Sequence, residues 1–282
     1  MDHVTDIHVH VQPWNQLKPD VRATMWKGRP EGEAFFENLM DDPDALLAEM
    51  DKRGIWRVAI INYPAPDVMG FTSEVNEFAA KYAARDPQRI IAFGGLMPDA
   101  VADPEKEVDR IAHLGIRGIK FQPPHQQFHA NAYVHGMDSL RHVYKRAAAR
   151  GLVVMIHTGT SIFPGARNRF GHPMDVDDVA VDFPDLQIVM AHGGRPLWMD
   201  EAMFVLRRHK NVWLDVSSIP PARLLDYFPR LADVSERVLW GTDWPAPGVP
   251  DMKTNLDTFL ALPLTDAAKR AIASDNARRL FP

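Results

Sequence analysis

Short apolar runs rich in valine and isoleucine recur along the whole chain. Each run is too short to form a buried helix and has the composition of a strand buried on both faces. We therefore predict eight strands, at Val4–His10, Val58–Tyr63, Ile90–Leu96, Ile116–Phe121, Leu152–His157, Gln187–His192, Val212–Val216 and Val238–Asp243.

Apolar positions with helical spacing lie between these runs. Ser73 is positioned to cap one helix, and Asp103, which a proline follows, is positioned to cap another. Asp138 opens a third helix, and two more are predicted at Asp44–Arg53 and Asp266–Leu280. Strands and helices therefore alternate along the chain.

The predicted strands start about 33 residues apart on average, which is the length of a βαβ unit. Eight such units predict a distorted (β/α)8 TIM barrel, in which the carboxyl ends of the strands form one rim that carries the active site. An open doubly wound sheet is the alternative, but the glycine-rich phosphate-binding motifs of such sheets do not occur. No break in composition divides the chain, so we expect residues 1–282 to form one domain.

Two predicted connections, residues 11–43 and 122–137, are long for a barrel. Long connections that follow strands often form lids or substrate walls. For the aromatic-rich first segment, extra packing or a dimer contact explains the length equally well.

Composition limits the possible chemistry. Apolar residues make up 46% of the chain, charged residues 24%, and the net charge is −5, which is typical of a globular protein and argues against nucleic-acid and membrane-surface partners. No membrane span or signal-peptide pattern occurs, so we expect a cytoplasmic protein. The chain has no cysteine and 12 histidines, so imidazole and carboxylate groups must bind any zinc, manganese or iron(II) ion.

Histidine and aspartate side chains end several of the predicted strands. His8 and His10 lie two positions apart and therefore share one face of the first strand. His157 ends the fifth strand, His192 the sixth and Asp243 the eighth, so all five side chains are expected to gather at the barrel rim. A backbone-satisfied buried histidine explains any one of them, and turn capping is an alternative for Asp243. The common position of all five favours a metal site.

Six short motifs in this order resemble the amidohydrolase superfamily, in particular its amidohydrolase-2 group. That group includes aminocarboxymuconate-semialdehyde decarboxylase-like and resorcylate decarboxylase-like enzymes, as well as lactone and amide hydrolases. The motifs are spread over nearly the entire length of the chain: D-I-H-V-H (6–10), G-I-K-F (118–121), M-I-H-T-G (155–159), A-H-G-G (191–194), L-W-G-T-D-W-P (239–245) and N-A-R-R-L-F (276–281).

The resemblance implies that His8, His10, His157 and Asp243 bind a single divalent metal ion. It also implies catalytic roles for His192, as a general base or acid, and for Asp243. Three imidazoles and one carboxylate suit zinc best and manganese second, and they leave a coordination position open. Such a metal lowers the pKa of a bound water, and a neutral histidine can accept the proton.

Three further polar residues belong to the predicted strands. Binuclear members of the superfamily use a carboxylated lysine on the fourth strand, where Lys120 lies, but the amidohydrolase-2 group usually does not, so we expect one metal ion. Lys120 would then pair with an aspartate or bind a substrate carboxylate. Asp6 either orients a ligand histidine or lies in solvent. Asp215 is expected to be buried and hydrogen-bonded, without a ligand role.

Several residues near the strand ends are predicted to contact substrate. The arginines would hold a carboxylate, with a surface position as the alternative, and the aromatic residues would wall the pocket, with rim packing as the alternative. The predicted contacts are Lys120, Gln122, His125, Arg167, Arg195, Tyr63 and Trp244.

Two reactions fit these residues. In the first, water activated by the metal attacks an amide, lactone or ester of a small carboxylate-bearing substrate, with His192 orienting the water. In the second, a small aromatic or unsaturated carboxylic acid loses carbon dioxide, and His192 or bound water protonates the carbon. The group's decarboxylases tend to be longer than this chain, which favours hydrolysis. The complete ligand set argues against a barrel that only binds metal, and the resemblance implies a homodimer.

Overall fold

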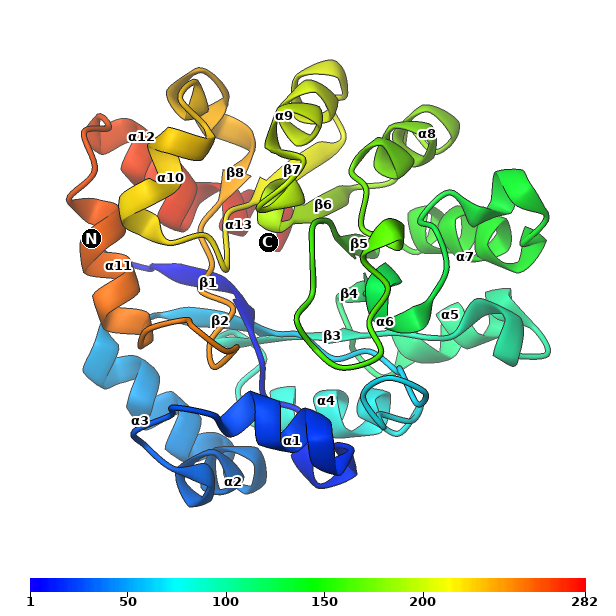
Figure 1. The fold of residues 1–282 in the computed structure, drawn as a ribbon, viewed down its shortest axis with the longest axis horizontal. Coiled ribbons are helices and arrows are strands. Elements are labelled where there is room, and N and C mark those ends of the chain that lie inside the picture. Colours follow the sequence, from blue (N-terminus) through cyan, green and yellow to red (C-terminus); the bar gives the residue numbers. More distant parts are fainter.

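The computed structural model describes residues 1–282, and eight parallel strands paired in chain order form its centre (Figure 1). Ile7 N donates to the carbonyl of Trp240, and Asp243 N donates to the carbonyl of His8, so the end of the last strand closes onto the first. This architecture confirms the predicted (β/α)8 barrel. The strands are β1 (Thr5–Val9), β2 (Arg57–Ile60), β3 (Ile90–Gly94), β4 (Gly118–Phe121), β5 (Val153–His157), β6 (Ile188–Ala191), β7 (Val212–Asp215) and β8 (Val238–Leu239).

Helices surround this barrel and cover the outer face of its strands (Figure 1). None of them has the length and apolar character needed to cross a lipid bilayer. The helices are α1 (Pro19–Trp26), α2 (Glu33–Asp41), α3 (Pro43–Arg53), α4 (Val75–Ala83), α5 (Pro104–His113), α6 (Pro123–Gln126), α7 (Asp138–Ala149), α8 (Met174–Asp182), α9 (Met199–Arg208), α10 (Leu224–Tyr227), α11 (Met252–Leu260), α12 (Asp266–Arg270) and α13 (Asn276–Leu280).

The strands are buried on both faces. Every strand residue is buried except Arg57, which begins β2 and is partly exposed. Side chains inside the barrel pack on one another, and those outside pack under the helices, as in other parallel sheets. This double burial explains why the strands read as continuous apolar runs in the sequence.

Two helix predictions need correction. Ser73 does not cap α4, because Glu74 precedes the helix and no side chain accepts a hydrogen bond there. Asp103 does cap α5, since its carboxylate accepts a hydrogen bond from Lys106 N at 3.1 Å. The predicted final helix is interrupted between α12 and α13 by a π-helical turn, Ala271–Asp275. A carbonyl in this turn accepts a hydrogen bond from Trp240 N at 2.9 Å, which ties the turn to the end of β8.

The long segment 11–43 contains α1 and α2 and packs its aromatic side chains against the loop that follows β8. Phe36 of α2 is fully buried, and its ring centroid lies 4.8 Å from that of Trp26 and 5.3 Å from that of Trp244. Arg29 Nη2 donates to the carbonyl of Pro245 at 2.6 Å. Aromatic packing therefore accounts for much of this segment, in agreement with one of the explanations that the sequence allows.

Phe36→Ala is expected to destabilise the protein by about 3–5 kcal/mol, because it removes the ring at the centre of this aromatic cluster and leaves a cavity. Urea denaturation would measure the change in the free energy of unfolding. Phe204, whose side chain is exposed on α9, provides the control, and Phe204→Ala is expected to change stability by no more than about 0.5 kcal/mol. Equal effects of the two substitutions would contradict the packing role of Phe36.

Candidate active site

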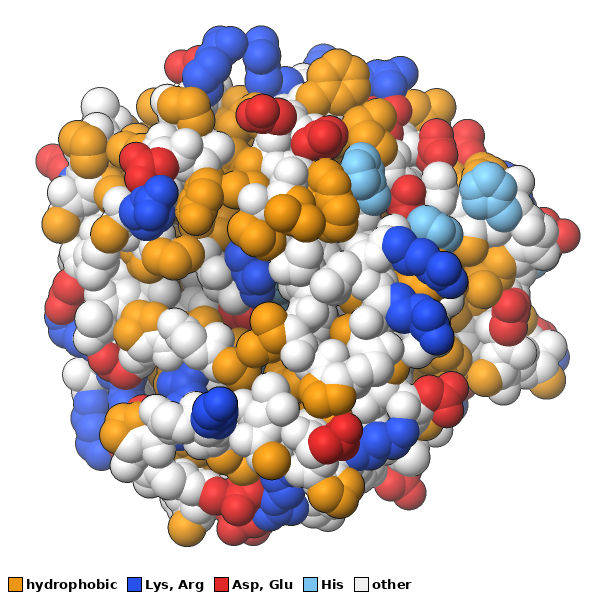
Figure 2. Space-filling model, viewed as in Figure 1, with side chains coloured by type: hydrophobic (Ala, Val, Ile, Leu, Met, Phe, Trp, Pro, Cys, Tyr) orange, Lys and Arg blue, Asp and Glu red, His pale blue; other side chains and the backbone are white.

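A pocket of about 300 Å³ opens at the carboxyl ends of the strands. Figure 2 shows a hollow near the middle of this face of the molecule. The pocket is lined by ten of the residues singled out from the sequence, which follow or end six different strands. They are His8, His10, Tyr63, Lys120, Gln122, His125, His157, His192, Arg195 and Asp243.

The two histidines at the end of β1 are fixed through their Nδ1 atoms. His8 Nδ1 lies 2.6 Å from Asp215 Oδ2, and His10 Nδ1 lies 3.3 Å from the carbonyl of Ile61. Because a carboxylate only accepts hydrogen bonds, His8 carries its proton on Nδ1 and has a lone pair on Nε2. The carbonyl of Ile61 holds the proton of His10 on Nδ1 in the same way whenever a cation binds His10 Nε2. The sequence motif H-V-H therefore presents two nitrogen ligand atoms to the pocket.

These two Nε2 atoms approach one carboxylate oxygen. Asp243 Oδ1 lies 2.9 Å from His10 Nε2 and 3.4 Å from His8 Nε2. At 2.9 Å from a carboxylate oxygen, His10 Nε2 must either carry a proton or share a cation with Asp243. Two imidazole nitrogens and one carboxylate oxygen this close together are a set of atoms that can bind zinc. The chemistry of this donor set therefore fits a divalent metal ion.

His157, at the end of β5, adds a fourth potential ligand. Both of its ring nitrogens are buried and have no hydrogen-bond partner. Burial, together with the nearby His192, lowers the pKa of His157 well below its usual range, so the ring is neutral. A buried imidazole without a partner is costly unless a ligand completes it, and a metal ion at the His8–His10–Asp243 cluster is consistent with that requirement.

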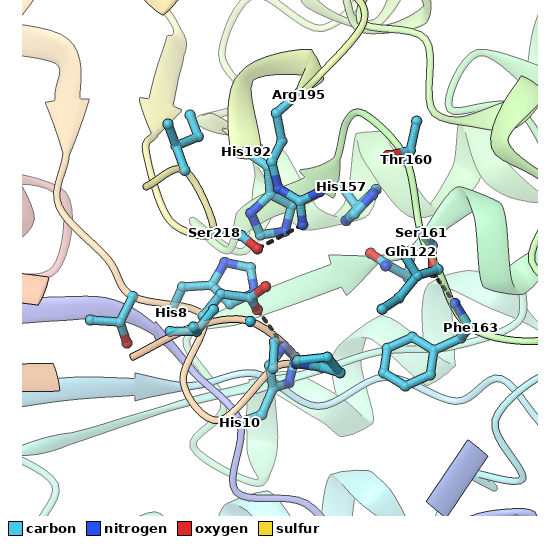
Figure 3. Close-up of a pocket in the computed structure, with 18 of the residues that line it drawn as sticks. His8, His10, Gln122, His157, Thr160, Ser161, Phe163, His192, Arg195 and Ser218 are labelled. Carbon is cyan, nitrogen blue, oxygen red and sulfur yellow. Dashed lines mark hydrogen bonds and ion pairs between the residues drawn. The ribbon is translucent and has the colours of Figure 1, made fainter. Parts of the chain in front are cut away.

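His192 follows β6 and lines the pocket (Figure 3). Its Nδ1 lies 3.0 Å from the carbonyl of Ser217, which only accepts, so Nδ1 carries the proton and Nε2 has the lone pair. The ring centroids of His192 and His157 lie 4.7 Å apart. His192 and Asp243 both have left-handed backbone conformations, with φ of 66° and 67°, which are uncommon outside glycine and often found at functional sites.

Asp215, at the end of β7, contacts His8 directly and reaches His192 through Ser217, whose Oγ lies 3.0 Å from His192 Nδ1. Its Oδ2 accepts hydrogen bonds from His8 Nδ1 at 2.6 Å and from Ser217 Oγ at 2.8 Å. The structure confirms the prediction that this residue is buried and hydrogen-bonded. The sequence did not reveal that the partner of Asp215 is His8, a candidate metal ligand. The position of Asp215 at a strand end, where the candidate ligands also lie, was a usable signal.

Asp215→Asn is expected to weaken zinc binding by about tenfold or more, because the charged partner that orients His8 and raises its basicity is lost. Competition with a chromophoric chelator would measure this affinity. Asp226→Asn offers a matched control, since Asp226 is exposed and bonds only Arg223. Equal zinc affinity in the Asp215 variant and the wild type would contradict the orienting role.

Two other charged residues, Lys120 and Asp6, lie near the candidate metal-ligand cluster. Lys120 is buried with Nζ 3.4 Å from His8 Nε2, and it makes no ion pair with an aspartate. Burial lowers the pKa of Lys120 to about 8. Asp6 is also buried and accepts hydrogen bonds from Thr242 Oγ1 at 2.6 Å and from His8 N at 3.1 Å, so it fixes the backbone near both ligand-bearing segments instead of orienting a ring.

Two predicted substrate contacts do not line the pocket. Trp244 directly follows Asp243, but its side chain is fully buried and packs on Phe36, so it forms part of the aromatic cluster. Arg167 is exposed, and the chain there is held by its backbone N–H, which donates to the carbonyl of Pro124 at 2.9 Å. Arg195 does line the pocket, and its Nη2 donates to Ser218 Oγ at 2.6 Å.

Several polar lining residues were not predicted. Gln12 lies two positions after His10, so the alternation that pairs His8 with His10 was a signal for it. Ser161 and Ser218 lie in loops beyond β5 and β7, where the sequence carries no periodicity that could identify them.

Two curated relatives have different activities. The chain is 25% identical over 303 residues to a gamma-resorcylate decarboxylase of Rhodococcus jostii (strain RHA1), in a match that covers 86% of this chain and 88% of that protein. It is 30% identical over 142 residues to a 2-pyrone-4,6-dicarbaxylate hydrolase of Comamonas testosteroni, but this match covers only 36% of this chain and 46% of that protein.

Solved structures share the fold over the whole chain. An uncharacterized TIM-barrel protein, Bb4693 of Bordetella bronchiseptica, matches with a TM-score of 0.78, 23% identity and coverage of 99% of this chain and 98% of that chain. The 5-carboxyvanillate decarboxylase of Novosphingobium aromaticivorans, solved with manganese and a nitrobenzoic acid, matches with a TM-score of 0.70, 15% identity and coverage of 99% and 97%. The profile of the Amidohydro_2 family of amidohydrolases matches residues 5–282, and together with the histidine and aspartate cluster at the barrel rim it identifies the chain as a member of the amidohydrolase family.

Proposed function

We propose that this protein is a metal-dependent hydrolase that cleaves an amide, lactone or ester of a small carboxylate-bearing substrate. The observation that carries this proposal is the hydrogen bond from His192 Nδ1 to the carbonyl of Ser217, which leaves the lone pair of Nε2 free in the pocket. Such an imidazole suits a general base that removes a proton from water. Direct protonation of a carbon atom would instead need a proton on this nitrogen.

His8, His10, His157 and Asp243 would hold one divalent metal ion, with zinc as our first choice and manganese as the second. When bound, this ion would supply Lewis-acid chemistry to the reaction. Three imidazoles and one carboxylate are a common donor set for zinc. The manganese found with the carboxyvanillate decarboxylase supports the second choice.

The remaining residues of the pocket bind and orient the substrate in this proposal. Arg195 would hold a substrate carboxylate, because its Nε is buried without a partner while Ser218 fixes the guanidinium. Gln122 is buried in the pocket wall with its Oε1 unpaired, so its amide is free to bind a polar group of the substrate. Lys120 adds a positive charge beside the metal ligands.

Decarboxylation is the second candidate, because the relative that aligns with 86% of this chain is named a decarboxylase. The same metal ligands would serve, and His192 or a water molecule would have to deliver a proton to carbon. The two candidates differ in the proton carried by His192 Nε2 when substrate binds.

A direct assay separates the two reactions. Full-length protein loaded separately with zinc and manganese would be given 2-pyrone-4,6-dicarboxylate, other small lactones and amides, and gamma-resorcylate. We expect hydrolysis of a lactone or amide, measured as a change in absorbance, and no release of carbon dioxide. Release of carbon dioxide from gamma-resorcylate, with no hydrolysis of lactones or amides, would overturn the proposal in favour of decarboxylation.

The proposal treats residues 1–282 as one catalytic domain that works as a homodimer in the cytoplasm. Light scattering coupled to gel filtration would measure the oligomeric state, and a monomer at assay concentration would exclude the dimer. Cell fractionation would test the location.

A further inference from the structure

The side chains of Tyr63, His125 and Ser161 are hydrogen-bonded in a row and form part of the pocket wall. The reaction proposed above assigns no role to this row of hydrogen bonds. The hydroxyl of Tyr63 lies 2.9 Å from His125 Nδ1, and His125 Nε2 lies 2.7 Å from Ser161 Oγ. The three residues belong to the segments after β2, β4 and β5, so the barrel rim brings them together. In Figure 3, Ser161 lies across the pocket from His8.

The imidazole ring of His125 carries a proton on only one of its two nitrogens. His125 is 2% exposed and Tyr63 is 3% exposed, so water does not compete for their hydrogen bonds. Burial lowers the pKa of His125 to about 3, which keeps the ring neutral at ordinary pH. One ring nitrogen therefore donates and the other accepts, and the three residues have a defined direction of donation.

The hydrogen-bond partners of the Tyr63 and Ser161 hydroxyl groups fix the direction of donation. The hydroxyl of Tyr63 has His125 as its one hydrogen-bond partner, so it must donate to Nδ1 or remain buried with an unpaired proton. His125 Nε2–H then donates to Ser161 Oγ, which also accepts a hydrogen bond from Phe163 N at 3.3 Å. Ser161 Oγ thus accepts twice, and its own proton has no acceptor within the protein.

We propose that Tyr63 and His125 form a positioning relay that holds the Ser161 hydroxyl as a hydrogen-bond donor to a carboxylate or carbonyl oxygen of the substrate. This proposal rests on the proposed function, and it narrows the substrate to small acids with two separated oxygen-bearing groups. Arg195 would bind one group, and Ser161, on the wall that also carries Gln122, would bind the other.

The opposite direction of donation has a different chemical meaning. If Ser161 donated to His125 Nε2, the imidazole would be placed to activate the serine as a nucleophile. Nδ1–H would then donate to Tyr63, and the buried tyrosine proton would lose its partner. The position of one proton on His125 therefore separates a binding role from a nucleophilic role.

Nuclear magnetic resonance of the full-length, zinc-loaded protein labelled with nitrogen-15 would locate this proton. We expect His125 to be protonated at Nε2 between about pH 5 and 9, as follows from a low pKa. Tyr63→Phe is expected to give a mixture of the two tautomers. Tyr144→Phe is the matched control, because it removes another buried hydroxyl, one that donates to Ala130 outside the pocket, and it should leave the His125 signals unchanged. His125 protonated at Nδ1 in the wild type would overturn the relay.

Steady-state kinetics with 2-pyrone-4,6-dicarboxylate would test the binding role of the hydroxyl. Ser161→Ala is expected to raise KM by about tenfold or more, as for loss of a hydrogen bond to a charged group, while kcat changes by less than about threefold. Ser161→Thr should restore KM, and Ser139→Ala, on the outside of the barrel, should have no effect.

The outcomes also separate this inference from the proposed function. Loss of kcat in Ser161→Ala with KM unchanged would identify a nucleophile and overturn the relay. Absence of wild-type activity on every lactone, amide and acid tried would count against the proposed function alone, because the tautomer of His125 still decides the direction of the relay. Unchanged KM and kcat in Ser161→Ala would overturn the binding role.

Discussion

Asp243→Asn is expected to abolish turnover and metal binding while the barrel stays folded. Asp243 carries the one carboxylate whose oxygen lies within 3.4 Å of both His8 Nε2 and His10 Nε2. An uncharged amide does not neutralise a divalent cation, so metal content measured by elemental analysis should fall from about one ion per chain to near zero. Turnover in metal-supplemented buffer should fall by about 10³-fold or more.

The fold should survive because the backbone of Asp243, and not its carboxylate, joins the end of β8 to β1. Asp243 N donates to the carbonyl of His8 at 2.8 Å, and asparagine keeps this bond. Asparagine also tolerates the left-handed conformation at φ of 67°. Circular dichroism and thermal unfolding should therefore resemble those of the wild type and of the surface control Asp226→Asn.

Three outcomes of the metal analysis would change the interpretation. Full metal content in the folded Asp243 variant would contradict the role of the carboxylate as a ligand. Two ions per wild-type chain would indicate that a carboxylated Lys120 bridges them. No metal in the wild type after supplementation with zinc or manganese would remove the metal site altogether.

The sequence predicts the barrel and its rim well because these features have local signatures. Strands buried on both faces read as apolar runs, and their regular spacing indicates the βαβ repeat. His8 and His10 could be assigned to one face by alternation alone, and the structure has both at the pocket. The fold and the gathering of the candidate ligands therefore depend on short-range patterns that a single sequence contains.

Contacts made by loops could not be predicted in the same way. Trp244 is adjacent to Asp243 in sequence, but its environment depends on Phe36 in a segment that carried no helix prediction. His125 and Ser161 are separated by 36 residues, and their contact depends on the course of the two connections that follow β4 and β5. Arg195 lines the pocket and Arg167 does not. The sequence could not distinguish them, because both lie in loops, where no strand periodicity indicates the direction of a side chain.

His192→Asn is expected to retain the metal ion and lower kcat by about 10²–10⁴-fold, which is the usual contribution of a general base. The amide nitrogen of asparagine can still donate to the carbonyl of Ser217, as His192 Nδ1 does at 3.0 Å, but no basic lone pair remains at the position of Nε2. Asparagine also accepts the left-handed backbone at φ of 66°. Metal analysis and single-turnover kinetics on the same preparation would test both expectations. His209→Asn is the control, because His209 lies outside the pocket with its Nε2 2.7 Å from Asp177 Oδ1.

Loss of metal from His192→Asn would contradict this assignment and make His192 a ligand. His8, His192 and Asp215 do present ligand atoms within 4.8 Å of one another, so a second arrangement of the ion is a real alternative. In that arrangement, however, Asp215 would have to bind the ion through oxygens that already accept hydrogen bonds from His8 Nδ1, Ser217 Oγ and Ser217 N. The cluster of His8, His10 and Asp243 has no such requirement, because its two Nε2 atoms already face the carboxylate oxygen. For this reason we expect His192→Asn to lose rate and keep its metal, and Asp243→Asn to lose both.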